Sequence, residues 1–543
     1  MRNHYERIVR DAEKRARQSL RRQVKQPGKS YGAFENENGV TEAKYAVYRA
    51  TSALSVYCCR DSCFYHDPEI FAMIRNGLRY AASRQHESGL FDLVGCNFES
   101  APDTAFILKR IHPFLMYLDA HRETKEEEEV FQLLREIAVK GANGVIHGGF
   151  HTPNHRWAIA SCLLLYGQYF DDAAMKKRAD DYLLEGIDCT EDGEFSEKSS
   201  GNYNRINNDA MIAIGHVKQD RQYFEYAVRN LRMMLTYIEP DGSIFTANST
   251  RQDNGKLVYP KDYYMEYLEM GIVMDIPLFL DMANYIFELV DEKHLRAPDF
   301  LIHFLNHPEW IDLEHEGVWK PADFNRLYRD SGIARVRRED CTYTVMQNKT
   351  DFLHVSTKTM HLTMKIGAGY FEHRAFKAQT LEKLEEGAGY AMDQVMQGWY
   401  YLPFAEKPAT SDWWKMDNAS RDKLEGPQLR FAVRVEEKEN GLDVRMKAEG
   451  VDGAPLRIEI AVSGADRVSG SQFDLKAEQG GSMILKDGAA AFSTEEETME
   501  VGPGFCAHRL TVGNLGSDAQ SPYAFTVYCT DYTEFDHTIQ IRF

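Results

Sequence analysis

Residues 156–170 read RWAIASCLLLYGQYF, and residues 428–450 read QLRFAVRVEEKENGLDVRMKAEG. The first stretch has apolar residues at three- and four-residue spacing, which is typical of an amphipathic helix. The second stretch alternates apolar with polar residues and contains ENGLD, a good signal for a β-hairpin turn. Because these two patterns occupy different halves of the chain, they predict two separate domains rather than one sheet with crossover helices.

The helical pattern continues from the N-terminus to about residue 312. It recurs at 130–142, 209–217 and 222–238, and the polar, glycine-bearing loops 189–204 and 239–256 separate successive helices. No sequence repeats at a fixed period, which disfavours a regular solenoid. We therefore expect residues 1–312 to form an incomplete (α/α) toroid, in which irregular helical hairpins close into a ring.

The alternating pattern takes over after about residue 316. It recurs at 353–367, 456–464, 523–532 and 537–543, with Gly, Asn and Asp at the turns between the stretches. We expect residues 313–543 to form an antiparallel β-sandwich. No glycine-rich loop follows a strand and opens a helix, so no nucleotide cofactor is expected.

Composition narrows the class of protein. The 543 residues carry 64 basic and 83 acidic side chains, a net charge of −19, with 27% charged and 43% hydrophobic residues. This balance excludes intrinsic disorder, and an acidic surface makes nucleic acid an unlikely partner. The N-terminal stretch lacks the apolar core of a signal peptide, and the nine cysteines are scattered without a repeated CxxC spacing. These features predict a cytoplasmic protein with no membrane partner, and they leave a homo-oligomer open.

The densest polar cluster of the helical half is His147-Gly-Gly-Phe-His-Thr-Pro-Asn-His-Arg-Trp157, directly before an apolar helix. Pro153 favours a helix start, so Asn154 and His155 lie near a helix N-terminus. Free backbone N–H groups and the helix dipole favour an anion there, and these side chains add hydrogen-bond donors. The alternative is that Asn154 caps the helix and His155 is a structural hydrogen-bonding residue.

A second polar cluster, Asp192–Asn204, runs into the helix at 209–217. Its Tyr203 is followed closely by Arg205, and a neighbouring cation can lower the pKa of a phenol from about 10 and prepare it for proton transfer. A half-buried structural tyrosine is the alternative. Loops between the helices of a ring converge at one end of it, so we expect Asn154, His155 and Tyr203 to share a cleft.

The two clusters and the helices-then-strands order resemble the heparinase II/III-like polysaccharide lyases and the related alginate lyases. The resemblance rests on Asn154-His155 and on the pattern DG-x-F-x-E-x-S-x-x-x-Y from Asp192 to Tyr203. In the second half, Gly398–Thr410 is similar to an aromatic, proline-bearing stretch of chondroitin and hyaluronate lyases, without its usual glycine. Trp157 is single where those enzymes have a tryptophan pair, and Lys198 stands where some carry a catalytic histidine.

The resemblance implies a β-elimination that removes the C5 proton of a uronic acid and expels the oxygen at C4. Asn154 and His155 would neutralise the carboxylate, and Tyr203 would act as base and acid in a syn elimination. An anti elimination needs a histidine on the opposite face, for which His373 is our candidate among the sandwich histidines. The side chains expected to contact the glycan are Asn97, Asp103, Arg156, Lys198, Arg205, Arg374, Trp399 and Tyr400.

The resemblance also includes a structural zinc ion in some relatives, but the dispersed histidines lead us to assign no metal and no cofactor, with a structural zinc or calcium left open. The expected partner is a short, imported anionic oligosaccharide. Two alternatives remain at this point. One is a toroid glycoside hydrolase with two carboxylates flanking the scissile bond, drawn from Asp103, Asp192, Glu197 and Asp209. The other is a carbohydrate-binding protein without catalysis.

Overall fold

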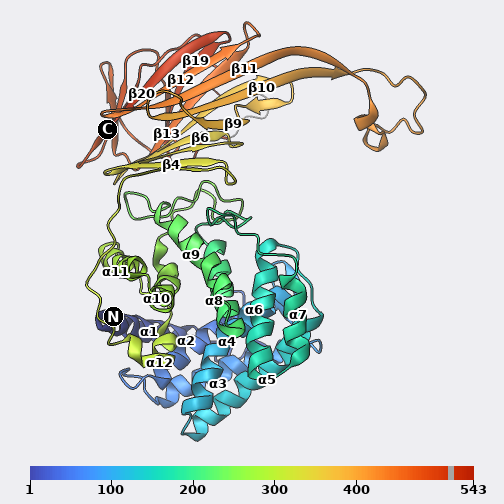
Figure 1. Cartoon of the computed structure of the whole chain (residues 1–543), viewed down its shortest axis with the longest axis vertical. Helices are drawn as coiled ribbons and strands as arrows, with labels where there is room; N and C mark the ends of the chain where they lie inside the picture. The colour runs from blue at the N-terminus through green and yellow to red at the C-terminus, as the bar shows by residue number, and fades with distance from the viewer. Residues whose placement is uncertain (512–518) are drawn as a thin grey trace. The chain divides into compact units, whose positions relative to one another are not determined.

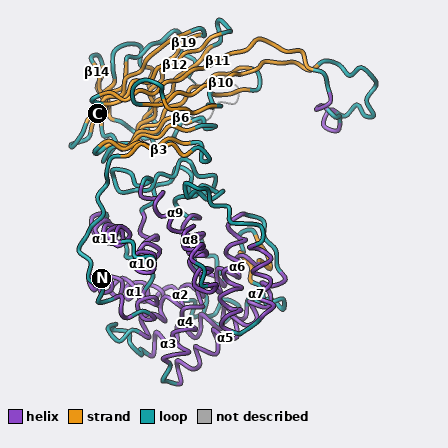
Figure 2. The backbone as a smooth tube through the Cα atoms, in the orientation of Figure 1, coloured by secondary structure: helices purple, strands orange, loops and turns teal. Residues whose placement is uncertain are grey.

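The computed structural model describes residues 1–511 and 519–543, and it divides into two compact units. The helical unit comprises Met1–Tyr237 and Gly242–Lys320. The strand unit comprises Ile238–Asp241 and Pro321–Phe543. Figure 1 labels the elements, and Figure 2 separates helices from strands by colour. Helices therefore precede strands, as the two sequence patterns predict.

The helical unit is an incomplete (α/α) toroid, which confirms the predicted fold class. The inner helices α2, α4, α6 and α8 contact one another in turn, α10 contacts α8, and α12 contacts α2 and α4. The remaining helices each pack on an inner neighbour. The helix bounds are α1 Arg2–Arg22, α2 Ala43–Cys58, α3 Pro68–Ser83, α4 Ala101–His121, α5 Lys125–His147, α6 Pro153–Tyr169, α7 Ala173–Leu183, α8 Tyr203–Lys218, α9 Arg221–Leu235, α10 Tyr264–Val273, α11 Pro277–Glu292 and α12 Leu301–Asn306.

Local sequence explains where these helices begin. A capping box formed by Thr124 and Glu127 starts α5, and Asp172 and Asp220 accept backbone N–H bonds at the starts of α7 and α9. Pro153 occupies the first turn of α6, where its missing N–H costs nothing. The four stretches predicted as helices from their periodicity correspond to α5, α6, α8 and α9, although the stretch 156–170 runs one residue past the end of α6 and the stretch 222–238 runs three residues past the end of α9.

In the part of the chain that the structure describes, the strand unit is a β-sandwich of two nine-stranded sheets. One sheet has the order β15-β14-β17-β18-β20-β12-β11-β10-β9, and the other has the order β16-β19-β13-β7-β6-β5-β4-β3 with β8 beside β7. Neighbours are antiparallel except for the short pair β16 and β19. The strand bounds are β3 Phe324–Tyr328, β4 Ile333–Arg338, β5 Cys341–Met346, β6 Asp351–Ser356, β7 His361–Tyr370, β8 His373–Ala375, β9 Thr380–Lys383, β10 Gly389–Tyr401, β11 Lys423–Lys438, β12 Gly441–Glu449, β13 Pro455–Ser463, β14 Arg467–Gly470, β15 Phe473–Lys476, β16 Ser482–Ile484, β17 Ala490–Ser493, β18 Thr498–Gly502, β19 Phe525–Tyr532 and β20 Phe535–Arg542.

Alternation along the strands fills the core between the sheets. On β12, Leu442, Val444 and Met446 are buried, while Arg445 between them is exposed. The predicted ENGLD hairpin is confirmed, because Lys438 of β11 pairs with Gly441 of β12 across a two-residue turn.

The stretch 353–367 departs from the prediction, since it forms two strands rather than one. The chain turns at 357–360 between β6 and β7, and Glu497 accepts hydrogen bonds from the side chains of Thr357 and Thr359 in that turn. These hydroxyls make an alternating sequence reverse direction. His354 and His361 consequently lie on neighbouring strands.

The segment after residue 312 continues to pack on helices up to Lys320. The Trp319 N–H donates to the Asp281 carbonyl at 2.9 Å, and the Asn284 amide donates to the carbonyls of His315 and Gly317. These bonds to α11 explain why the division falls eight residues later than the expected boundary at 312. Nothing in the local alternation of this segment signals them.

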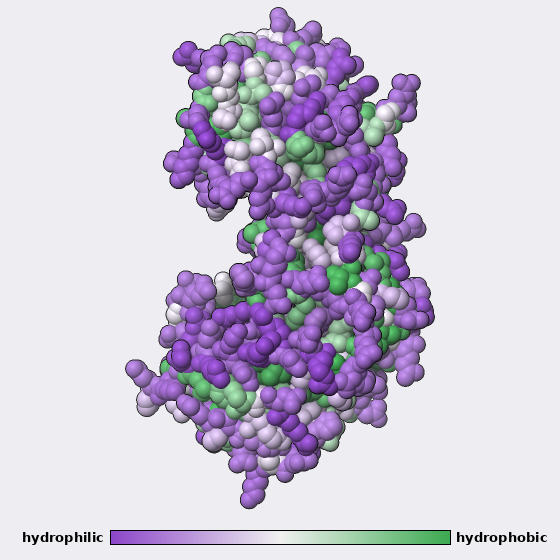
Figure 3. Space-filling view, turned by 90° about the vertical axis from the view of Figure 1, so that its left-hand side faces the viewer, coloured by the Kyte–Doolittle hydropathy of each residue, from purple (hydrophilic) through white to green (hydrophobic). Residues whose placement is uncertain are grey.

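The surface displayed in Figure 3 is mostly polar, and the cysteines form no disulfides within the described residues. Figure 3 shows mostly hydrophilic side chains on the displayed face, with hydrophobic ones in small, scattered groups. Across residues 1–511 and 519–543, no helix combines the length and the apolar character needed to cross a bilayer. All nine cysteines lie in the described residues and are free thiols.

A buried ion pair anchors Ile238–Asp241 within the strand unit. The Arg335 guanidinium on β4 is fully buried and lies 2.8 Å from a Glu239 carboxylate oxygen, and Thr342 donates to the same carboxylate. The Arg337 guanidinium adds a 2.8 Å bond to the Ile238 carbonyl. Removing either charge would leave the other buried without its counter-ion, which typically costs several kcal/mol.

We therefore predict that Glu239→Ala destabilises the strand unit by about 3–5 kcal/mol, because the buried Arg335 guanidinium then loses the Glu239 carboxylate. Chemical denaturation followed by circular dichroism measures this change. The control is Asp536→Ala, which breaks the solvent-exposed pair with Arg445 and should shift the denaturation midpoint little. A Glu239→Ala midpoint equal to that of the wild type would contradict the prediction.

Candidate active site

The candidate site lies where inner helices of the toroid begin. Asn154 and His155 occupy the first turn of α6, Tyr203 is the first residue of α8, and Asp103 lies in the first turn of α4. Inner helices that contact one another in turn bring their starts together at one end of the ring. The N-terminal ends of these helices add partial positive charge there.

Asn154 presents an unused hydrogen-bond donor. Its backbone N–H donates to Glu197 Oε2 at 3.2 Å, and its side-chain Oδ1 accepts from the Thr152 hydroxyl at 2.9 Å. The residue is fully buried, and among the described residues its Nδ2 has no hydrogen-bond acceptor. A buried donor without an acceptor is costly, so this amide is suited to an anionic ligand group.

His155 supplies a neutral imidazole beside this amide. Its pKa is lowered to about 4, chiefly by burial, with His151 and Arg251 adding to the decrease and Asp103 opposing it. Its ring meets the edges of His151 and Phe106, with centroids 5.0 and 6.1 Å away. Its Nδ1 is buried and has no partner within the described chain. At neutral pH the ring can therefore give or accept one hydrogen bond without carrying charge.

Glu197 connects the start of α6 to Tyr203 through Arg251. Arg251 Nε lies 3.3 Å from Glu197 Oε1, and its guanidinium lies 5.2 Å from the centre of the Tyr203 ring. The Tyr203 hydroxyl donates to Gln252 Oε1 at 3.3 Å. Burial raises the pKa of Glu197 above its ordinary value, although Arg251 acts against this. Asn154, Glu197, Arg251 and Tyr203 thus form one connected group.

Two further bonds hold the loops of this group together. The Thr250 hydroxyl donates to the Glu197 carbonyl at 2.8 Å. Asp253 accepts from the hydroxyls of Ser199 and Ser249 and from the Gly201 N–H, all within 2.9 Å. The loop before α8 and the loop that carries Arg251 therefore form a single hydrogen-bonded structure.

Asp103 and Asn97, both predicted as substrate contacts, meet on the other side of His155. Asp103 Oδ1 lies 3.2 Å from Lys44 Nζ, and its Oδ2 accepts from Asn97 Nδ2 at 3.4 Å. Burial acts against ionisation, but Lys44 and three hydrogen bonds hold the pKa of Asp103 below its ordinary value. Lys44 also sits 5.0 Å from the centre of Phe106, whose ring meets His155.

Two of the predicted substrate-binding arginines have other partners. Arg156 lies 2.9 Å from a Glu185 oxygen and 3.2 Å from an Asp188 oxygen, and it covers the Trp157 ring. Burial lowers the pKa of Arg205, but the carboxylates of Glu266, Asp262 and Asp209 outweigh this and raise it. Two positions along a helix turn a side chain by about 200°, so Arg205 does not follow Tyr203. Both guanidinium groups thus lie near carboxylates, and their contact with a substrate stays a prediction.

Lys198 lies in the turn that leads to α8. Its backbone has a φ of 50°, in the left-handed region, and its N–H donates to the Phe195 carbonyl at 2.8 Å. This turn places Glu197 toward Asn154.

The remaining predicted residues belong to the strand unit. His373 and Arg374 lie on β8, and Trp399 and Tyr400 lie on β10. His361 has an acidic partner in that unit, with its Nε2 3.3 Å from an Asp241 oxygen. Across the described residues, no group of three or more His, Cys, Asp or Glu side chains could hold a metal ion.

Sequence reasoning missed Arg251, Gln252 and Lys44. The loop 239–256 has a polar composition, ANSTRQDN, but it reads as a separator between helices. Lys44 lies at the start of α2, more than 100 residues before His155. Only the ring arrangement shows that these residues are neighbours of Tyr203 and His155.

Comparison with known proteins places the fold. No family model matches the chain, and no curated protein matches it in sequence. The structure of the Streptomyces coelicolor A3 chondroitin AC lyase in complex with chondroitin sulphate matches 99% of this chain and 79% of its own, with a TM-score of 0.56 and 11% identity. The chain has a polysaccharide lyase fold.

Two other solved structures agree. A Paenibacillus xanthan lyase matches 99% of this chain with a TM-score of 0.59 and 9% identity, although the chain spans only 56% of that protein. Heparinase III matches 95% of this chain and 80% of its own, with a TM-score of 0.56 and 12% identity. At these identities the likeness establishes the lyase fold, while the chemistry depends on the residues described above.

We predict that His155 stays neutral down to about pH 4, since burial opposes its protonation. A histidine-selective ¹⁵N NMR titration measures this, with the signal assigned through the His155→Gln variant. His216 is the control, because its bond to Glu269 raises its pKa above the ordinary value, so it should protonate at higher pH. A His155 midpoint near 6.5 would contradict the prediction.

Proposed function

We propose that this protein is a polysaccharide lyase that cleaves a uronic-acid-containing glycan by β-elimination. The observation that carries the proposal is the free, buried donor Asn154 Nδ2 beside neutral His155, in one connected group with Tyr203 and Arg251. A base removes the proton from C5, the electron pair forms the C4–C5 double bond, and the C4–O bond breaks. The leaving oxygen takes a proton, and the product ends in an unsaturated uronyl residue.

The start of α6 fits the carboxylate of the uronic acid. Negative charge grows on this carboxylate as C5 loses its proton, so fixed donors aimed at it lower the barrier. Asn154 Nδ2 and His155 supply such donors, and the α6 dipole adds a favourable field. Because Glu197 fixes the Asn154 backbone, the amide need not reorganise when the charge develops.

Tyr203 fits the proton transfers. Within residues 1–511 and 519–543, its hydroxyl donates to Gln252 at the long distance of 3.3 Å, so a substrate can replace this bond. In the phenolate form, Tyr203 can take the C5 proton, and the phenol that this forms can then donate the proton to the leaving oxygen on the same face of the sugar. Arg251 places a positive charge beside the ring during these transfers.

The acidic candidates favour elimination over hydrolysis. A hydrolase requires two carboxylates that reach the scissile bond. Glu197 is 3% exposed and engaged by Arg251, while Asp103 is engaged by Lys44. Asp209 lies 2.6 Å from Lys109 Nζ. Three of the four candidates thus have cationic partners of their own.

The decisive experiment compares the wild type with Tyr203→Phe on a panel of uronic-acid glycans. Elimination creates a conjugated double bond, so a lyase produces a new ultraviolet absorbance. We expect Tyr203→Phe to lose at least about 100-fold in turnover, the size expected for a lost proton-transfer group, while glycan binding stays near that of the wild type.

The control is Tyr523→Phe, which alters a tyrosine that is 74% exposed in the strand unit and should not affect turnover. New reducing ends without ultraviolet absorbance would favour the hydrolase instead. Binding without turnover on every glycan would favour the non-catalytic protein. Full activity of Tyr203→Phe would remove Tyr203 from the mechanism.

A further inference from the structure

A long hairpin extends from one sheet of the strand unit. β9 pairs with β10 only up to Asp393, and β12 pairs with β11 only from Arg430 onward. Beyond these limits the two strands pair with each other and lead into a loop with two short helical turns, which Figures 1 and 2 show as a projecting segment. We call residues 397–428 the arm. A two-stranded ribbon has little stability of its own in water, so other contacts must hold the arm in one conformation.

Aromatic rings and cations alternate along one face of the arm. Tyr401 pairs in register with Lys423, and Lys423 Nζ lies 3.9 Å from the centre of the Trp399 ring. The Trp399 and Tyr401 rings are 4.6 Å apart, and Trp413 follows at 6.2 Å from Tyr401. Arg421 lies 5.3 Å from the Trp413 ring. We call these five side chains the aromatic ladder.

The opposite face of the arm is different. Neighbouring strand residues point to opposite faces, so Tyr400 points away from the ladder and meets Phe371 at 5.2 Å. Leu424 pairs with Tyr400 and shares that face. Gly398 makes this contact feasible, because a Cβ there would lie 2.4 Å from the Phe371 ring. The predicted pair Trp399 and Tyr400 is thus split between the two faces.

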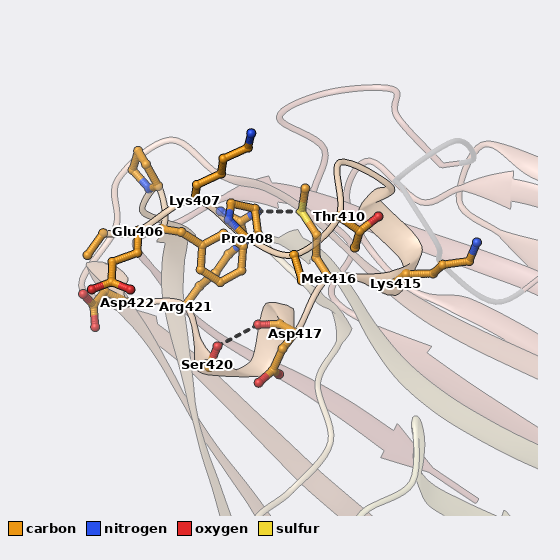
Figure 4. A pocket seen from close by; sticks show the side chains of 14 residues that line it. Glu406, Lys407, Pro408, Thr410, Lys415, Met416, Asp417, Ser420, Arg421 and Asp422 are labelled. Carbon is orange, nitrogen blue, oxygen red and sulfur yellow. Dashed lines mark hydrogen bonds between the residues drawn. The ribbon is translucent and has the colours of Figure 1, made fainter.

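The tip of the arm is organised around Arg421. Its Nε donates to Asn418 Oδ1 at 2.8 Å, its Nη1 donates to the Leu402 carbonyl at 3.3 Å, and its guanidinium lies 3.8 Å from the Phe404 ring. Figure 4 shows Arg421 within the pocket formed by the tip. These contacts fix a cation beside aromatic rings before any ligand arrives, which lowers the entropic cost of binding.

The tip pocket has a volume of about 510 Å³ and a lining of both charges. Three basic and three acidic side chains line it, and Figure 4 labels all six. They are Lys407, Lys415, Arg421, Glu406, Asp417 and Asp422. Carboxylates accept hydrogen bonds from hydroxyl groups but repel a continuous row of phosphates, so the lining suits a hydroxyl-rich ligand with sparse negative charge.

We propose that the aromatic ladder is a binding site for an acidic glycan chain, an inference that rests on the proposed function. Tryptophan and tyrosine faces stack on the apolar faces of sugar rings, and Lys423 and Arg421 lie beside them to pair with uronic carboxylates. Several rings in succession fit several sugars. The ladder therefore favours a longer glycan than the short oligosaccharide expected from the sequence.

Charge favours the glycan over a second copy of the chain. The arm has four basic and five acidic side chains, so it is nearly neutral, whereas the whole chain carries −19. Two copies would bring most of that negative charge together, and this repulsion opposes self-association. A glycan that reaches the nearly neutral arm meets less repulsion than at an average part of the surface.

The test measures binding of the full-length protein by affinity electrophoresis in gels that contain alginate or chondroitin sulphate. Trp399→Ala should weaken binding of at least one of these polymers about tenfold or more, and Lys423→Gln should weaken it while keeping both rings. Leu424→Ala is the matched control, since it removes an exposed apolar side chain from the opposite face and should stay within twofold of the wild type. Neutral dextran and oligo(dT) are the comparison ligands.

Four results would overturn the proposal. They are wild-type binding to neither acidic polymer, unchanged binding in both ladder variants, equal weakening by Leu424→Ala, and stronger binding to oligo(dT) than to the acidic glycans. Arm-dependent dimers in light scattering would assign the ladder to a second copy instead. Thermal unfolding verifies that each variant folds, and Lys423→Gln still tests the site if Trp399→Ala does not.

The same experiment separates this inference from the proposed function. If the ladder variants weaken glycan binding but the wild type forms no ultraviolet-absorbing product, the binding site is retained and the lyase is rejected. The opposite result is also possible. If Trp399→Ala changes neither glycan binding nor the formation of an ultraviolet-absorbing product, the lyase is retained and the binding site is rejected.

Discussion

The Glu197 carboxylate is the constraint on which the candidate active site depends. One oxygen accepts the Asn154 backbone N–H at 3.2 Å, and the other lies 3.3 Å from Arg251 Nε. Three segments that are distant in sequence, the start of α6, the loop before α8 and the loop that carries Arg251, therefore meet at one buried group. Glu197 is buried, whereas Arg251 is partly exposed, so the carboxylate depends on this pair and on the Asn154 N–H for its compensation. Glu197 thus acts on the site through the groups that it positions.

This arrangement concentrates donors in a protein that is acidic as a whole. A net charge of −19 repels an anionic substrate, so attraction must be local. The starts of inner helices provide it through their dipoles, through the free Asn154 amide, and through Lys44 and Arg251. Neutral His155 adds a donor or acceptor without adding charge.

The sequence predicted the parts of this site that depend on local signals. Asn154 and His155 could be found because Pro153 and the following apolar run mark a helix start, and Tyr203 because a polar loop enters a helix. Arg251 and Lys44 could not be found, since only ring closure brings them near. The carboxylate neighbours of Arg156 and Arg205 could not be found from the sequence either, because helix rotation decides which way each guanidinium group points.

The sandwich illustrates a similar limit. Alternation predicted its strands and the turn at Lys438–Gly441, because both signals are local. The reversal at 357–360 depends on Glu497, about 140 residues away, so the same alternation gave one strand where there are two. The spacing of histidines along the sequence also does not show which of them lie near acidic groups. The contact between His361 and Asp241 is an example.

The arm differs from the rest of the strand unit in what stabilises it. Most strand residues gain stability by burying apolar side chains between two sheets, whereas Trp414 is 90% exposed and Trp413 is 47% exposed. Order at the tip comes instead from Arg421 bound to a carbonyl, an amide and an aromatic ring. Exposed aromatic rings add little to folding, since they stay in water. A ligand that covers these rings gains the burial energy that folding leaves unused, which is the physical basis of the glycan-binding site proposed above.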